Sequence, residues 1–430
     1  MSNTTIFYGA GDSAKFNYER FVDAGLIPDC FADKDKSKHQ TKFDPLEYTS
    51  LQWDTSYAGG QPILPLDEAI SRHPNYIIYP TQNPQVRPKI IEYLVEHGVE
   101  RNRIRTFEEQ GFEWRLGCKS LSSAIVFWPD KIMACCSSEV GGPNTFYSGT
   151  DISEPLKDHY GLRKQITDDL LSGRQTVCTG CPNLKDGFYR TNSNYELVAL
   201  DGVFKHSKCN LMCIYCGYTK KSDFDKNNTS ISVLEALRQI LVMCPDVKII
   251  RFVPGEPTIN PEFEEAIRLC EQNNLSVEVL TNCVVYSEKL AEMMKKGKGQ
   301  INVSLDSGTR VTYKKIKQVD CFDNVINNLY KYAEAGGKIE LKYILLQDTN
   351  DNYNEIGAFI DIAASINAKI IIAQNDVFAK KRLSKNYSDL LKQFISNSLK
   401  RNVFVRIETS RFDPIDFKSL DEFRKHLLIG

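Results

Sequence analysis

The chain has 430 residues and a formal net charge of −1, with 54 Lys and Arg residues against 55 Asp and Glu residues. This length allows two or three domains with ordinary hydrophobic cores, and the balanced charge excludes bulk attraction to nucleic acid or to an anionic membrane. The sequence shows neither a signal-peptide pattern nor an apolar stretch of about 20 residues, so we expect a cytoplasmic protein with no nucleic-acid or membrane partner.

Residues 1–110 alternate strand and helix patterns. Strands are expected at 5–8, 29–32, 75–79 and 104–106, and helices at about 14–24 and 88–97. Gly9 and Gly11 follow the first strand and open a helix, and Asp33 ends the second strand. This order is typical of a dinucleotide-binding turn, in which the glycines approach a pyrophosphate and the acid contacts a ribose. The pattern predicts a small Rossmann-like domain that contacts a phosphate or nucleotide, binds NAD, or has only a structural role.

Residues 111–195 are less regular, with one helix expected near Leu162–Leu171. They contain the pair Cys135-Cys136 and the motif Cys178-x2-Cys181. In a reducing cytoplasm, grouped cysteines indicate metal ligands or redox groups rather than disulfides. The spacing is compatible with an iron–sulfur cluster, with structural zinc or with no metal. Adjacent cysteines both bind one centre only where the backbone turns, and Cys118 is the spare ligand if they do not.

Residues 196–430 return to a regular strand–helix alternation. Strands are expected at 197–200, 247–252, 276–280, 301–305, 338–346, 369–373 and 403–407, and helices at 233–243, 261–273 and 353–366, among others. Repeated units of this length predict parallel strands with right-handed crossovers, arranged either as a barrel or as an open sheet. The isolated cysteines of the chain are expected to be small buried hydrophobic side chains: Cys30, Cys244, Cys270, Cys283 and Cys321.

A third cysteine group, Cys209-x3-Cys213-x2-Cys216, comes shortly after the first of these strands. Three thiolates can hold three irons of a [4Fe–4S] cluster and leave the fourth iron open to the amine and carboxylate of a ligand. Zinc is the alternative metal, and it would need a fourth protein ligand, for which His206 is the nearest residue. In a barrel, this loop would lie on the face where active sites form.

The spacing C-x3-C-x2-C, with Tyr215 before the third cysteine, resembles that of the radical S-adenosylmethionine (SAM) enzymes. Segments after the next strands agree with this resemblance: Gly255-Glu256-Pro257, Thr281-Asn282 and Ser304-Leu305-Asp306-Ser307. Two positions depart from the pattern of the family, because Pro254 replaces the first glycine of its GGEP segment and Cys283 stands where glycine is usual.

The resemblance implies an α/β fold with a partial (βα)6 TIM-like barrel, preceded by the cysteine-rich and Rossmann-like domains. It also implies a [4Fe–4S] cluster at Cys209, Cys213 and Cys216, with SAM as the second cofactor. The implied SAM contacts are Tyr215 near the adenine, Gly255 and Glu256 at the methionine amine, Thr281 and Asn282 at the next strand end, and Ser304 and Asp306 near the ribose. The reduced cluster would cleave SAM to a 5′-deoxyadenosyl radical that takes a hydrogen atom from a substrate, with an electron donor such as flavodoxin or ferredoxin.

The other cysteine set resembles the SPASM and twitch domains of this family, which usually follow the barrel. The resemblance implies one auxiliary [4Fe–4S] cluster at Cys135, Cys136, Cys178 and Cys181. We expect an enzyme that acts on a small molecule such as a sugar or a nucleotide-linked sugar, and the basic run Lys380-Lys381-Arg382 is either a phosphate contact or a solvated surface. The alternatives are a maturase that modifies a peptide or protein side chain and a non-catalytic scaffold that binds nucleotide and metal.

Overall fold

The computed structural model describes the chain over residues 4–23, 25–39, 41–43, 52–54, 60–118, 121, 124–133, 144–148, 150–179, 181, 184–190, 195–201, 204–216, 231–253, 255–368, 370–375 and 387–408. The chain forms two compact units, one of residues 1–122 and 167–193 and the other of residues 123–166 and 194–430. Residues 111–195 are thus shared between the two units, and the division into three domains stays a prediction. None of the described helices is long and apolar enough to cross a membrane.

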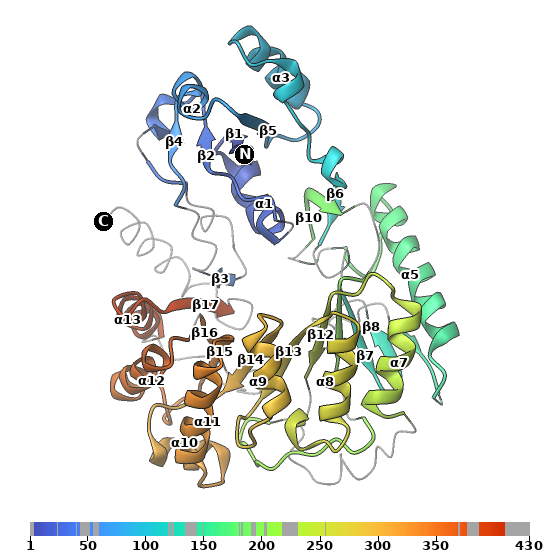
Figure 1. Cartoon of the computed structure of the whole chain (residues 1–430), viewed down its shortest axis with the longest axis vertical. Coiled ribbons are helices and arrows are strands. Elements are labelled where there is room, and N and C mark those ends of the chain that lie inside the picture. The colour runs from blue at the N-terminus through green and yellow to red at the C-terminus, as the bar shows by residue number, and fades with distance from the viewer. Residues whose placement is uncertain are drawn as a thin grey trace. The chain divides into compact units, whose positions relative to one another are not determined.

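The first unit is built on a parallel sheet of four short strands (Figure 1). Their order is β4 (Ile63–Leu64), β2 (Cys30–Ala32), β1 (Thr4–Tyr8) and β5 (Tyr76–Pro80). Alternate residues of these strands enter two separate cores, one shared with α1 (Asp12–Asp23) and one with α2 (Leu66–Arg72) and α3 (Arg87–Glu96). The unit is therefore a small α/β layer structure with its sheet in the middle.

Further short elements complete this unit. They are η1 (Lys36–Lys38), β3 (Gln52–Asp54), η4 (Arg101–Arg103), η5 (Glu108–Gln110), β6 (Phe112–Gly117) and β10 (Lys185–Arg190). β6 and β10 pair antiparallel, with Gly117 opposite Lys185. The strand expected at 104–106 is reduced to a single bridge between Ile78 and Ile104, because the preceding residues form the 3-10 helix η4.

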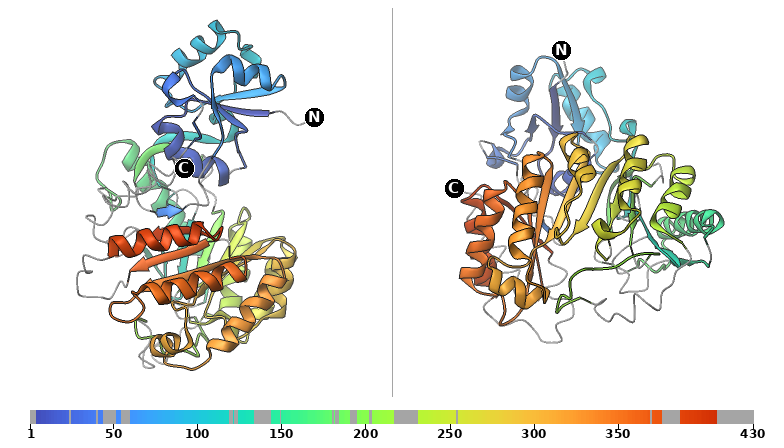
Figure 2. Two further views of the ribbon diagram at one scale, coloured as in Figure 1. Left: turned by 90° about the vertical axis from the view of Figure 1, so that its left-hand side faces the viewer. Right: turned by 60° about the horizontal axis from the view of Figure 1, so that its bottom comes forward.

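The second unit contains one large sheet. Its strand order is β17 (Phe404–Glu408), β16 (Ile370–Asn375), β15 (Lys338–Leu345), β14 (Gly299–Ser304), β13 (Ser276–Thr281), β12 (Ile249–Phe252), β11 (Leu197–Leu200), β7 (Ala124–Trp128), β8 (Lys131–Met133) and β9 (Asn144–Phe146). All neighbours from β17 to β7 are parallel, and β8 and β9 continue antiparallel. This order does not return to its first strand, so the described strands form an open sheet, which Figure 2 shows as curved.

The helices of this unit follow the strands in alternation (Figure 1). They are α5 (Ser153–Leu171, whose last turns belong to the first unit), α7 (Val233–Met243), η7 (Pro257–Ile259), α8 (Phe263–Gln272), α9 (Glu288–Lys295), α10 (Arg310–Lys317), α11 (Phe322–Glu334), α12 (Tyr353–Ser365) and α13 (Tyr387–Leu399). Each expected strand between residues 197 and 407 is present, with its ends within two residues of the expected ones. The period-2 and period-3.6 patterns were therefore sufficient for this part of the fold.

The expectation of an irregular segment between 111 and 195 is wrong for part of it. β7 pairs with β11 in parallel register and turns into the antiparallel strands β8 and β9. The signal was present in the sequence, because the apolar run at 124–128 is followed directly by a Pro-Asp turn. The helix expected near Leu162–Leu171 is the second half of α5, which begins at Ser153.

Candidate active site at the strand ends

The three grouped cysteines lie in the segment 204–216 that follows β11. In this segment, the backbone N–H of Met212 donates to the Lys317 carbonyl at 3.2 Å, and that of Ile214 donates to the Ile316 carbonyl at 3.0 Å. Cys209 is exposed and Cys213 and Cys216 are half-buried. The end of α10 thus fixes the backbone on both sides of Cys213, because the last carbonyls of a helix have no partner within the helix.

The electrostatics of these thiols show that they stand near one another. Although the Cys209 residue is exposed, the protein around its thiol withdraws the sulfur from water and raises its pKa to about 11, and the charges of Glu256, Cys213 and Cys216 also act to raise it. Burial also raises the pKa of Cys213, against the ammonium of Lys317, which lowers it. A metal stabilises thiolates that would otherwise be costly in such a place.

The donor set fits an iron–sulfur cluster. The three cysteines stand in one loop at the spacing C-x3-C-x2-C, and each can bind a different iron of a [4Fe–4S] cluster while the fourth iron stays open to a ligand. Cys209, Cys213 and Cys216 are the residues that would hold the cluster.

Glu256 organises the strand end next to the cysteine loop. Its side chain is 1% exposed, and one oxygen, Oε1, accepts hydrogen bonds from the hydroxyls of Thr258 and Thr281 at 2.7 and 2.6 Å. The other, Oε2, accepts the backbone N–H of Asn282 at 2.6 Å. Burial raises the pKa of Glu256, while these hydrogen bonds oppose the rise. The carboxylate therefore joins the ends of β12 and β13, and both of its oxygens are engaged in these hydrogen bonds.

Asn282 connects this carboxylate to the cysteine loop. Its side-chain amide donates to Asn210 Oδ1 at 2.6 Å and lies 3.8 Å from the sulfur of Cys209. The sequence-predicted residues Cys209, Glu256, Thr281 and Asn282 are thus brought together by direct contacts, although no two of the three segments that carry them are adjacent in sequence.

Gly255 allows the turn to pass close to the segment before Cys209. Its φ is +67°, and a Cβ at this position would stand 2.6 Å from the carbonyl oxygen of Lys208. The same carbonyl accepts the backbone N–H of Glu256 at 2.7 Å. A side chain is excluded here by both backbone conformation and space.

The fourth strand end holds a buried ionic network that the sequence analysis did not predict. Asp306 is fully buried at φ +59°. Its Oδ2 accepts hydrogen bonds from the Tyr215 hydroxyl at 2.5 Å and the Lys317 ammonium at 2.6 Å, and its Oδ1 accepts the Ile344 backbone N–H at 2.8 Å. The tyrosine ring packs against Ile316 and its neighbours. Asp306 and Tyr215, both predicted to contact SAM, therefore lie side by side. In the structure, their polar groups bond to each other and to Lys317.

A sequence signal for Lys317 did exist. On α10 it stands on the same buried face as Tyr313 and Ile316, at spacings of four residues and one residue. A lysine in the apolar stripe of an amphipathic helix indicates a buried charge with a partner. Ser304, the remaining predicted residue of this segment, is half-buried at the end of β14.

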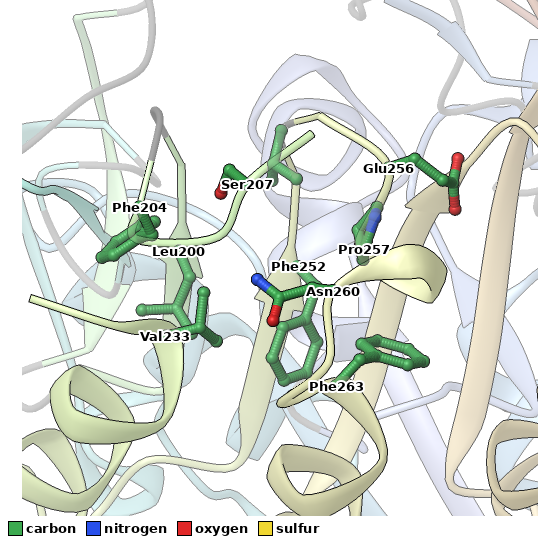
Figure 3. A pocket seen from close by; sticks show the side chains of 10 residues that line it. Leu200, Phe204, Ser207, Val233, Phe252, Glu256, Pro257, Asn260 and Phe263 are labelled. Atoms are coloured by element: carbon green, nitrogen blue, oxygen red, sulfur yellow. The ribbon is translucent and has the colours of Figure 1, made fainter. Parts of the chain in front are cut away.

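The pocket shown in Figure 3 lies beside this site rather than in it. Its walls are mainly apolar, from Leu200, Phe204, Val233, Phe252, Val253, Pro257 and Phe263, with Ser207, Glu256 and Asn260 as polar members. Leu200 and Phe252 belong to the buried face of their strands, which packs on the helices. The pocket is thus a gap between sheet and helices, and the Glu256 carboxylate in Figure 3 points away from the phenyl rings that line it.

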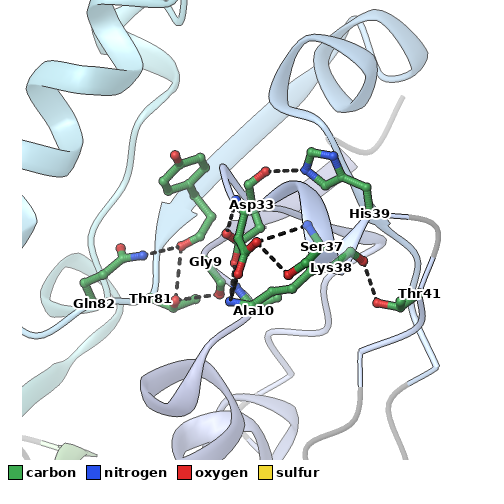
Figure 4. Close-up of polar contacts among 11 residues, drawn as sticks. Gly9, Ala10, Asp33, Ser37, Lys38, His39, Thr41, Thr81 and Gln82 are labelled. Atoms are coloured by element: carbon green, nitrogen blue, oxygen red, sulfur yellow. Dashed lines mark hydrogen bonds and ion pairs between the residues drawn. The ribbon is translucent and has the colours of Figure 1, made fainter.

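The glycine turn of the first unit places Gly9 and Asp33 together, as Figure 4 shows. Asp33 Oδ2 accepts the backbone N–H of Ala10 at 2.8 Å and the ammonium of Lys38 at 3.1 Å. Gly9 adopts φ +97°, and a Cβ there would stand 2.1 Å from Gln82 Nε2. The carboxylate expected to face a ribose therefore bonds to the turn itself. A ligand contact at Gly9, Gly11 and Asp33 stays a prediction.

The auxiliary cysteines are described only in part. Cys178 and Cys181 are half-buried in a turn closed by the Cys181 backbone N–H and the Cys178 carbonyl at 3.0 Å. Cys135 and Cys136, like the basic run Lys380, Lys381 and Arg382, lie outside the described residues. Of the isolated cysteines, four are buried as expected, and Cys321 is half-buried before α11.

Comparison with known proteins finds a family match within the second unit. The model of the radical SAM superfamily matches residues 204–362. A GTP 3′,8-cyclase of Clostridium perfringens is 28% identical over 160 residues, which are 36% of this chain and 49% of the relative. A probable GTP 3′,8-cyclase of Pyrococcus abyssi is 25% identical over 182 residues, covering 42% of this chain and 58% of the relative. The chain spans about half the length of these curated relatives.

Solved structures give weaker likenesses. Streptococcus suis SuiB has a TM-score of 0.42 and 15% identity over 61% of this chain and 55% of its own. anSMEcpe with bound AdoMet and Cp18Cys peptide has a TM-score of 0.37 and 20% identity over 49% of this chain and 63% of its own. The family match at residues 204–362 agrees with the resemblance of the cysteine spacing and of the later strand-end segments to the radical SAM superfamily.

Proposed function

We propose that Cys209, Cys213 and Cys216 hold a [4Fe–4S] cluster and that SAM binds to it across the adjoining strand ends. The observation that carries the proposal is the chain of contacts from Cys209 through Asn282 to Glu256. When bound, the cluster supplies one electron to the sulfonium of SAM, which yields methionine and a 5′-deoxyadenosyl radical that removes hydrogen from the substrate. The part of the protein is to hold SAM and substrate in contact and away from water.

The carboxylates of Glu256 and Asp306 already have hydrogen-bond partners within the protein, which limits the groups that remain to contact SAM. The Glu256 carboxylate already accepts hydrogen bonds from Thr258, Thr281 and Asn282, so the methionine amine would be held by the backbone at Gly255 and Glu256. The Asp306 carboxylate is occupied by Tyr215, Lys317 and Ile344. The ribose contact then falls to Ser304.

We also infer that Cys118 belongs to an auxiliary [4Fe–4S] centre with Cys178 and Cys181. Cys118 follows directly on Gly117, which stands opposite Lys185 in the ladder of β6 and β10. The Leu184 backbone N–H donates to the Cys181 carbonyl at 3.0 Å, just before that ladder begins. The register therefore brings Cys118 and the Cys178–Cys181 turn to one end of the β6–β10 ladder.

Iron content tests both centres together. The wild-type protein, reconstituted anaerobically, should bind about eight irons, and a variant with Cys209, Cys213 and Cys216 changed to Ala should keep about four. In that variant, Cys118→Ala or Cys178→Ala should remove the remaining iron, whereas the matched change Cys321→Ala should not. Full iron in the first variant would contradict the primary site, and zinc or no metal there would contradict the auxiliary centre.

For the substrate, we propose a small polar molecule of the nucleotide or nucleotide-sugar class. The sheet face opposite the buried strand residues carries polar side chains in register, with Arg251 paired to Glu278 at 2.6 Å and the Asn302 amide donating to Glu340 at 3.3 Å. A closed barrel would fill these positions with branched apolar side chains. The name GTP 3′,8-cyclase of the curated relatives supports a nucleotide.

Calorimetry on the anaerobic, SAM-loaded protein tests this choice. GTP and a panel of nucleotide sugars should include at least one ligand whose affinity falls with added salt, because a charged phosphate is recognised through screened contacts. Binding of a short precursor peptide encoded beside the gene, with no binding across the nucleotide panel, would contradict the proposal and support a maturase.

A further inference from the structure

The buried ammonium of Lys317 is the unusual charge of this site. The side chain is 1% exposed and its Nζ lies 2.6 Å from Asp306 Oδ2 and 2.8 Å from the Tyr215 hydroxyl. Withdrawing two charges from water is costly, and the cost is recovered only with close pairing and further hydrogen bonds. Asp306 has such bonds, since Ile344 donates to its second oxygen.

The same residue holds the cysteine loop through its backbone. α10 ends at Lys317, and Gln318 follows in the left-handed conformation at φ +60°. The freed carbonyls of Ile316 and Lys317 accept the N–H groups of Ile214 and Met212. Main chain and side chain of one helix end therefore meet the loop on the two sides of Cys213.

The charge of Lys317 is held against the cysteine loop. Its Nζ donates at 2.8 Å to the hydroxyl of Tyr215, which stands between Cys213 and Cys216 in the sequence. The carbonyl of Lys317 accepts the N–H of Met212, the neighbour of Cys213. A cluster bound by this loop would therefore have a buried positive charge beside it.

We propose that Lys317 is a positioning residue that aligns the cysteine loop and, by its buried positive charge, makes the bound cluster easier to reduce. The proposal rests on the [4Fe–4S] site proposed above. Reduction adds one electron from an external donor such as dithionite, and the added negative charge is stabilised by a nearby cation in a medium of low dielectric. Asp306 is the counter-ion that allows this cation to be buried.

A set of variants separates charge from structure. Lys317→Met removes the charge at similar length, Lys317→Arg keeps it, and Asp306→Asn removes the counter-ion. The double variant Lys317→Met/Asp306→Asn avoids an unpaired buried carboxylate and is the form best able to fold. Lys314→Met is the matched control, since Lys314 lies on the same helix with its side chain 63% exposed.

The readout is the midpoint potential of the cluster signal that responds to SAM, measured by redox titration with electron paramagnetic resonance. Lys317→Met should shift the potential to more negative values and Asp306→Asn to more positive values. The double variant should have a more negative potential than Asp306→Asn, because it lacks the positive charge as well, and Lys317→Arg and Lys314→Met should leave the potential near that of the wild type. Opposite shifts from removal of the two partners cannot arise from loosened packing alone.

Two results would overturn the proposal: equal potentials in the double variant and in Asp306→Asn when both hold their full iron, or shifts of the same sign in Lys317→Met and Asp306→Asn. Failure of the underlying function looks different, because the wild-type protein itself would then show no cluster signal that responds to SAM.

Discussion

At the scale of single residues, the contacts of Cys283 explain how a cysteine can stand where the family pattern usually has glycine. It adopts φ +62° directly after β13, a conformation that favours glycine, and yet its side chain is fully buried. Its N–H donates to the Thr281 hydroxyl at 2.9 Å and its carbonyl accepts the Asn328 amide at 3.0 Å. These contacts hold the turn in the conformation that glycine would adopt without strain.

At Cys283, the usual stability advantage of an alanine variant over a glycine variant should therefore be reduced. Glycine normally destabilises a buried regular position relative to alanine, and Cys270, buried within α8, offers that reference. At each position, the difference in the free energy of unfolding between the Gly variant and the Ala variant measures the penalty for glycine. This penalty should be about 1–2 kcal/mol smaller at Cys283 than at Cys270, because glycine relieves the strained backbone at Cys283. Chemical denaturation of the four variants measures their free energies of unfolding. Equal penalties for glycine at the two positions would contradict the claim that the backbone at Cys283 is strained.

The residue scale also shows where sequence patterns reach their limit. The spacing of Cys209, Cys213 and Cys216 indicated a metal centre, and the resemblance implied that this centre is a [4Fe–4S] cluster. The roles of Asp306 and Tyr215 were taken from the resemblance, and the partner that occupies both, Lys317, is eleven residues from Asp306 and lies on a helix. The apolar stripe of α10 indicates that Lys317 is buried with a partner, but which carboxylate it meets depends on tertiary packing.

At the scale of elements, the turn from β12 into η7 determines how the site is assembled. Gly255→Ala should destabilise the protein and abolish SAM binding, because the new Cβ would meet the Lys208 carbonyl at 2.6 Å and move the segment before Cys209. Gly297→Ala is the matched control, since it has a similar φ of +71° but nothing within 4 Å of the added Cβ.

Thermal unfolding and SAM calorimetry distinguish the two substitutions. The control should cost about 1 kcal/mol of backbone strain and keep its affinity for SAM, whereas Gly255→Ala should lose that affinity. Equal SAM affinities in the two variants would show that the close approach of Gly255 to Lys208 does not shape the site.

Most strands and helices of the second unit were predicted from the periodicity of apolar residues alone. The elements that were missed have physical causes. Alternating burial along β13 and β14 matches the pleat of a sheet covered by helices on one side. β7 to β9 were missed because they are short and join the sheet by pairing with β11, a contact between residues about 70 positions apart. The apolar run at 124–128 indicates a strand, but the strand with which it pairs cannot be read from either segment alone.

At the scale of the whole molecule, the sequence predicted the strands of the second unit from β11 to β17 and the resemblance that the family match at residues 204–362 agrees with, but not the tasks of the remaining parts. The glycine turn of the first unit has the predicted residues together, and still Asp33 bonds to Ala10 and Lys38 of that same unit. A ligand-binding turn and a self-contained one share the same sequence signal. Only the contacts of the carboxylate tell them apart.

The central claim is that Cys209, Cys213 and Cys216 hold one cluster whose open iron takes SAM. The most direct measurement is electron paramagnetic resonance of the dithionite-reduced protein with and without SAM, with assay of 5′-deoxyadenosine in the same samples. SAM should change the cluster signal and yield 5′-deoxyadenosine in the wild type and in Cys321→Ala, and both effects should be lost in Cys213→Ala. A signal change and cleavage that persist undiminished in Cys213→Ala would contradict the account.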